Sequence, residues 1–93
     1  MILSFKNNET QLIWEGKVSR KLPIEIQKTA RRKLRMIHNS FSLNDLRVPP
    51  GNRLEKLEDD LAGFFSIRIN KQWRIIFQWD EGNAFQVMIT DYH

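Results

Sequence analysis

Two arginines, Arg68 and Arg74, lie in a stretch that otherwise reads as two short strands, SIRINKQWRIIF at positions 66–77. Apolar residues alternate with other residues on both sides of Asn70, a pattern typical of a β-hairpin. If both odd-numbered apolar sets face the core, the connection must have an odd length, and we expect a three-residue loop at 70–72. Arg68 then lies opposite Arg74 on the second face of the sheet.

Two like charges directly opposed destabilise a sheet by some fraction of ~1 kcal/mol. The presence of this arginine pair therefore needs an explanation. An anion bound between the two guanidinium groups supplies one, because arginine binds phosphate with a planar fork of donors. The neighbouring even positions make the same face amphipathic, which suits RNA: Ser66, Ile76, Gln78, Met88 and Thr90. The alternative is that the two arginines bind no ligand. Exposed arginines are common on strands, and Arg74 could simply form an ion pair with Asp91 or Glu58.

The chain ends in Asp91-Tyr92-His93. Histidine titrates near neutral pH and is therefore a candidate for proton transfer, although residues at a terminus often carry no function. His38 closes an expected helix, where a positive charge is favourable, and is not our catalytic candidate.

Composition narrows the class of protein. The 93 residues are expected to form one domain, 1–93, and a net charge of +4 favours an anionic partner. The absence of cysteine excludes disulfides and thiolate metal sites, and no apolar run has the ~20 residues of a membrane span. No metal-binding, nucleotide-binding or serine-hydrolase motif occurs. We expect a soluble cytoplasmic protein that uses no metal and no cofactor.

The period of the apolar residues changes along the chain. A short helix is expected from a cap at Asn8 to Gly16, and a longer one at 23–38 with an apolar stripe and an opposite basic side. A turn of helix is expected at 42–45 and no regular structure at 48–51. Strands are expected at 63–69, 73–79 and 85–90, with a short one at 53–57. The fold class is α+β, with two N-terminal helices on one face of a small antiparallel sheet.

The second hairpin follows the same parity argument. A three-residue loop at 81–83 places Trp79 opposite Phe85 and Phe77 opposite Val87, so that all odd positions of the last strand face the core.

Several segments together resemble the HigB-type branch of the RelE superfamily, the toxins of bacterial toxin–antitoxin modules. They are SF at 4–5, ARRKLRMI at 30–37, LRVPPGNRLE at 46–55, GFFSIRINKQWRIIFQW at 63–79 and the final DYH at 91–93. The resemblance covers nearly the whole chain and implies a RelE-like fold.

The resemblance also implies an activity: a ribosome-associated endoribonuclease that cuts messenger RNA during translation without a metal ion. It implies neutralisation by a HigA-type helix-turn-helix antitoxin, through which the toxin reaches operator DNA. Arg68 and Arg74 would bind the phosphate, His93 would transfer protons, Asp91 would orient it, and Tyr92 would stack on a base or assist. Basic residues expected to contact RNA are Lys28, Arg32, Arg35, Arg53, Lys56 and Lys71.

One departure stands out. Relatives often carry LKGD where this chain has LEDD at 57–60, which places Glu58 at the position of a lysine. Two other functions remain open. One is a weakly catalytic toxin that acts mainly as a corepressor with its antitoxin, and the other is a small RNA- or ribosome-binding module without cleavage, which the net charge of +4 and the basic helix alone would permit.

Overall fold

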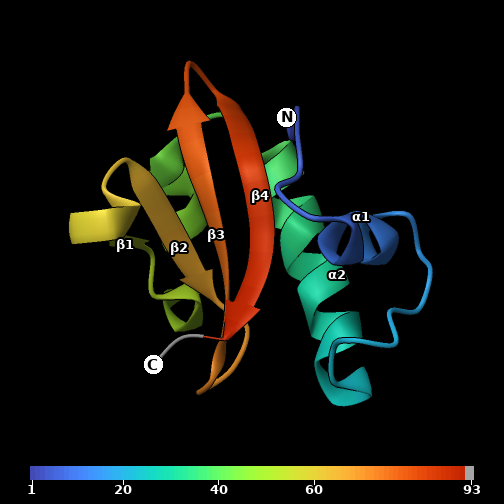
Figure 1. Ribbon diagram of the computed structural model, residues 1–93. Coiled ribbons are helices and arrows are strands. Elements are labelled where there is room, and N and C mark those ends of the chain that lie inside the picture. Colours follow the sequence, from blue (N-terminus) through green and yellow to red (C-terminus); the bar gives the residue numbers. More distant parts are fainter. Residues whose placement is uncertain (92–93) are drawn as a thin grey trace.

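The computed structural model describes residues 1–91. Its helices and strands are α1 (Asn8–Trp14), α2 (Ile24–Asn39), β1 (Glu55–Lys56), β2 (Phe64–Arg68), β3 (Trp73–Asp80) and β4 (Asn83–Asp91), with 3-10 turns η1 (Leu43–Arg47), η2 (Pro50–Asn52) and η3 (Asp59–Leu61). The strands form one antiparallel sheet in the order β1-β2-β3-β4. Both helices lie on one side of this sheet, beside β4 (Figure 1). This confirms the predicted α+β arrangement.

The helices begin where capping chemistry allows. Asn7, and not Asn8 as predicted, caps α1: its side chain accepts a hydrogen bond from the Thr10 backbone at 2.9 Å. Gly16 follows α1 with φ +84°, a conformation that suits glycine and ends the helix. Pro23 precedes the first residue of α2 rather than occupying it.

The core lies between the helices and one face of the sheet. The predicted stripe of α2 is buried, and it packs with Ile13 of α1 against the apolar side of β2, β3 and β4. Fully buried members from the two layers include Ile13, Ala30, Leu34, Ile37, Ile67, Ile75, Phe77, Ala84 and Val87. The other side of the sheet, here called the open face, carries the even-numbered residues of β2 and β3.

The two hairpins differ in how well parity predicted them. In the first, Arg68 pairs with Arg74 and Ile67 with Ile75, as expected. The predicted three-residue loop at 81–83 is wrong, because Asp80 pairs directly with Asn83 around a two-residue turn. Both turn residues have positive φ, the geometry that matches the twist of paired strands.

A bulge in β4 then restores the register. Trp79 pairs with Ala84, and Gln78 with Phe85, so Phe85 lies on the open face and the predicted Trp79–Phe85 pair is wrong. Gln86 has φ +53° at the irregularity, after which the pairs again follow the predicted alignment up to Thr90 opposite Arg74. The shift places the small Ala84, fully buried, beneath the N-terminal segment.

The N-terminal segment covers the outer edge of β4. Leu3 donates to the Ala84 carbonyl at 2.8 Å, and Lys6 donates to the Val87 carbonyl at 3.0 Å. The Thr10 hydroxyl accepts from the Ile89 backbone at 2.9 Å, which ties α1 to the same edge. Hydrogen bonding along this edge protects it from pairing with another chain and fixes Lys6 beside the sheet.

The segment between α2 and β1 is more ordered than expected. The turn of helix predicted at 42–45 is present as η1, with a capping box between Ser42 and Asp45. A second 3-10 turn, η2, forms where no regular structure was predicted, because buried Asn52 donates to the carbonyls of Leu46 and Val48 at 3.2 and 3.4 Å. Within residues 1–91, every helix is too short or too polar to cross a membrane.

Candidate active site on the open face

The arginine pair lies where strand parity placed it. Arg68 is directly opposite Arg74, and Arg74 is opposite Thr90, all on the side of the sheet away from the helices. Arg68, Arg74 and Thr90 are half-buried, whereas Ser66 and Ile76 in the neighbouring row are buried. The cations of the open face are therefore partly shielded from water, which strengthens their electrostatic effect on a bound anion.

Within residues 1–91, Ser66 and Glu55 contact the Arg74 guanidinium group. Its Nη1 donates a hydrogen bond to the Ser66 hydroxyl and lies 3.7 Å from a carboxylate oxygen of Glu55. The pairing of β1 with β2 sets Glu55 beside Ser66, so both belong to the open face. The Arg74 side chain is 14% exposed and that of Glu55 45%. These contacts fix the guanidinium group before any ligand arrives, and they place a carboxylate next to it.

Arg68 is positioned through its backbone as well as its side chain. Its Nε donates to the Asn70 carbonyl at 2.9 Å, while its own carbonyl accepts from Lys33 Nζ at 2.7 Å. Lys33 comes from α2, is buried, and also donates to Asn52 Oδ1 at 2.7 Å. Burial lowers the pKa of Lys33, and the nearby charges of Arg32 and Arg68 lower it further. A buried lysine thus joins α2, the loop before β1 and the arginine hairpin.

The predicted C-terminal cluster is only partly described. Asp91 ends β4 and pairs with Trp73, so it lies on the other face of the sheet from Arg74. Its Oδ2 accepts a hydrogen bond from Gln72 Nε2 at 2.9 Å. Tyr92 and His93 lie outside the described residues. Their assignment to the site stays a prediction.

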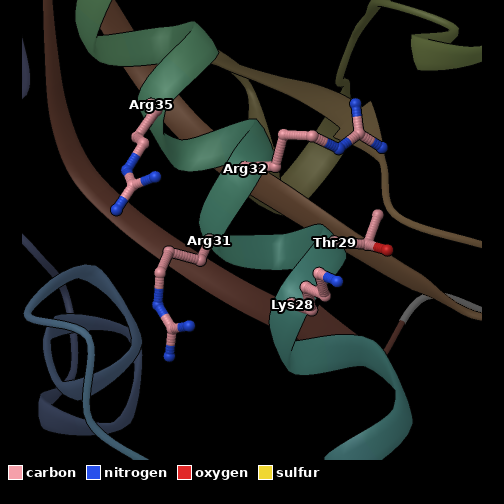
Figure 2. A pocket seen from close by; sticks show the side chains of 5 residues that line it. All are labelled: Lys28, Thr29, Arg31, Arg32 and Arg35. Carbon is pink, nitrogen blue, oxygen red and sulfur yellow. The ribbon is translucent and has the colours of Figure 1, made fainter.

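The basic residues predicted to contact RNA fall in different places. Lys28, Arg32 and Arg35, here called the α2 ridge, are exposed along one helix. Together with Thr29 and Arg31 they line a hollow of about 400 Å³. Figure 2 shows Arg31 and Arg35 pointing to one side of the helix and Arg32 to the other. Arg31 is used structurally, since its Nε donates to the Ile13 carbonyl at 2.9 Å near the end of α1.

The remaining predicted contacts are exposed but scattered. Lys71 lies in the β2–β3 connection, and Arg53 follows η2 in a left-handed conformation with φ +46°. Lys56 pairs with Phe65, so it points away from the open face, opposite to its neighbour Glu55. Glu58 is exposed just before η3.

Sequence reasoning missed the groups that hold the arginines: Glu55, Ser66 as a partner, Lys33 and Asn52. A signal existed for Ser66, because it shares the parity of Arg74. None existed for Glu55 or Lys33, because their places depend on pairing between segments far apart in the chain. Among residues 1–91 there is also no group of three or more His, Cys, Asp or Glu residues suited to a metal ion.

Comparison with known proteins gives a consistent result. A family described as the RelE-like toxin of type II toxin–antitoxin system HigB matches residues 3–93. Toxin HigB-1 of Vibrio cholerae is 42% identical over 99% of this chain and 98% of its own length. Endoribonuclease HigB of Proteus vulgaris is 30% identical over the whole of both chains. The YoeB-YefM complex from Staphylococcus aureus has a chain with the same fold, with a TM-score of 0.62 and 18% identity over 100% of this chain and 98% of that one.

Proposed function

Because this chain belongs to the HigB family of RelE-like toxins of type II toxin–antitoxin systems, we propose that it is an endoribonuclease that cuts messenger RNA on the ribosome. One observation carries the proposal: Arg68 and Arg74 emerge together on the open face, with the Glu55 carboxylate beside Arg74. A relative of 30% identity bears the name endoribonuclease, which supports the same reaction class.

The reaction that fits this face is attack of a ribose 2′-hydroxyl on the adjacent phosphorus. The O2′–P bond forms and the P–O5′ bond breaks, which leaves a cyclic 2′,3′-phosphate and a 5′-hydroxyl. Negative charge grows on the phosphoryl oxygens in the transition state. Arg68 and Arg74 supply fixed positive charge at that point, and no metal ion is needed for this role.

Two protons must move in this scheme, one away from the 2′-hydroxyl and one onto the departing O5′. Glu55 is a carboxylate within 3.7 Å of the Arg74 guanidinium, and we assign it as a candidate proton acceptor. His93 is our candidate for the second transfer, with Asp91 orienting it and Tyr92 stacking on a base or assisting the transfer. Glu55 was not among the catalytic residues expected from the sequence, and we add it because of its position on the open face.

The α2 ridge is proposed to contact ribosomal or messenger RNA. Its three exposed cations, Lys28, Arg32 and Arg35, lie along one helix around a hollow large enough for a phosphate group. Arg53, Lys56 and Lys71 remain predicted contacts of the same kind.

We further propose that a HigA-type helix-turn-helix antitoxin neutralises the toxin and links it to operator DNA. A solved YoeB-YefM toxin-antitoxin complex from Staphylococcus aureus contains a chain with this fold, which supports a protein partner of that class. The two alternatives raised by the sequence, a corepressor and an RNA-binding module, differ from the proposal in lacking cleavage.

The test is induction of the protein alone in cells, followed by mapping of transcript 5′ ends. We expect growth arrest and new 5′ ends within translated regions, and we expect Arg74→Ala to abolish both. Arg47→Ala, which removes an exposed arginine from η1, is the matched control and should leave both intact. Cleavage that survives Arg74→Ala unchanged would refute the catalytic assignment.

A further inference from the structure

A second feature of the open face lies two rows beyond the arginines, toward the β3–β4 turn. Phe64 pairs with Gln78, and Gln78 pairs with Phe85, so two aromatic side chains lie in the same row of the open face. Both phenylalanines are partly exposed. Phe64 lies there by the regular alternation of β2, whereas the two-residue turn and the bulge in β4 together place Phe85 on the open face instead of the core side.

A cation already sits against this aromatic row. Lys6 Nζ lies 5.6 Å from the centre of the Phe64 ring. The backbone of Lys6 is fixed to the edge of β4 by its hydrogen bond to the Val87 carbonyl, so its side chain reaches over the open face from that edge. A partly exposed aromatic ring capped by the ammonium group of an exposed lysine is a surface that accepts a planar π-system.

The spacing relates this surface to the arginine pair. Phe64 is two residues from Ser66, the residue bonded to Arg74, and two residues span about 7 Å along a strand. A phosphate bound at Arg74 therefore brings a neighbouring base within reach of Phe64.

The energies favour exchange of the ammonium group for a base. A base stacked on an aromatic side chain contributes more free energy than a cation over an exposed ring. We propose that Phe64 is a stacking subsite for a nucleobase next to the scissile phosphate, and that displaced Lys6 contacts the adjoining phosphate. This inference rests on the proposed function, since the occupant is the RNA substrate.

The alternative is that Phe64 only packs. Its carbonyl accepts from the Leu57 backbone, and Leu57 is buried. If Phe64 only packs, its replacement lowers stability but does not change the stacking of any nucleobase. The test must therefore measure base stacking directly.

The experiment uses ribosomes programmed with a messenger that carries fluorescent 2-aminopurine at each nucleotide of the vacant codon in turn. A 2′-O-methyl group at each sugar of that codon prevents cleavage. Binding of the wild-type toxin should quench the fluorescence at one position through stacking. Phe64→Leu should abolish the quench and weaken binding on the order of 10-fold, whereas Phe64→Trp should retain both. Lys6→Gln should keep the quench and reduce the salt dependence of binding.

Phe41→Leu is the control, because Phe41 is 90% exposed and follows the end of α2, outside the strands of the open face. A quench retained by Phe64→Leu, or absent at every position with wild-type toxin, would overturn the inference. Cleavage of the unmodified messenger is measured with the same proteins. Cleavage without any Phe64-dependent quench removes the subsite alone, whereas a Phe64-dependent quench without cleavage keeps the subsite and removes the ribonuclease.

Discussion

On the open face of the sheet, Arg74 is 14% exposed and is held by Ser66 and Glu55, whereas on α2 the side chains of Arg32 and Arg35 extend into solvent. The first arrangement keeps a charge at one fixed point in a partly dry environment. The second offers several solvent-exposed charges to any nearby anion, and salt screens them. A transition state requires the first kind of charge, and the capture of a large polyanion requires only the second.

The two regions should therefore respond differently to a swap that keeps the charge but changes the shape. Arg74→Lys replaces a planar fork by a point charge that cannot keep the geometry to Ser66, Glu55 and phosphate together. We expect the single-turnover cleavage rate on programmed ribosomes to fall on the order of 10²-fold. Arg35→Lys, in the α2 ridge, should change the same rate less than about twofold, because an exposed cation depends little on shape. Equal losses in both variants would contradict this division of roles.

Lys33 is the link between the two regions, since it belongs to α2 but bonds to the Arg68 carbonyl and to Asn52. Lys33→Met leaves two buried acceptors without this donor, and we expect the free energy of unfolding to fall by about 1–3 kcal/mol. Urea denaturation measures the change. Lys28→Met, on the exposed side of the same helix, should stay within about 0.5 kcal/mol of wild type.

The pH dependence of this difference has a definite sign. Burial and the charges of Arg32 and Arg68 lower the pKa of Lys33 below 10.5 in the folded protein. Between that lowered pKa and 10.5 the unfolded chain binds more protons than the folded one, so the contribution of Lys33 to stability rises with pH. The stability of wild type relative to Lys33→Met should therefore grow from neutral toward alkaline pH. A difference that shrinks over the same range would show that Lys33 does not titrate as its burial requires.

The sequence predicted the strand register correctly where the alternation of apolar residues was long and uninterrupted. Alternating apolar residues run through both arms of the β2–β3 hairpin, and parity therefore fixed the Arg68–Arg74 pair. Parity failed in β4 because a two-residue turn at Glu81-Gly82 and a bulge at Gln86 each shift the register by one residue, and the two shifts cancel. Polar and glycine residues permit both features, so the sequence did not distinguish them from a three-residue loop.

The site was predictable only where it depended on a single hairpin. Glu55 reaches Arg74 because the two-residue strand β1 pairs with β2, and such a short strand has too little pattern to set a register. Lys33 reads as one more member of a basic run on α2, and its burial follows from acceptors contributed by Asn52 and Arg68. A side chain whose partners come from distant segments gives no local signal.

The α2 ridge gives the smallest expected effect and the clearest separation of binding from structure. Replacement of Lys28, Arg32 and Arg35 by Gln should weaken ribosome binding about 10-fold at ~0.1 M salt and should reduce the slope of log affinity against log salt by roughly 2–3. The cleavage rate of bound complexes should not change. Lys28 and Arg32 are like charges four residues apart, so their neutralisation should raise helix stability by a few tenths of a kcal/mol.

The ridge variant is expected to bind the ribosome more weakly while its helix becomes slightly more stable. Weaker binding by a protein that is at least as stable cannot be attributed to misfolding. The matched control removes the same charge from exposed residues elsewhere, as Arg20→Gln, Lys21→Gln and Arg47→Gln. If both triple variants lose equal affinity and equal salt slope, net charge alone drives the association and α2 is an ordinary solvated face. If only the ridge variant does so, the exposed cations of the α2 ridge are the RNA contact.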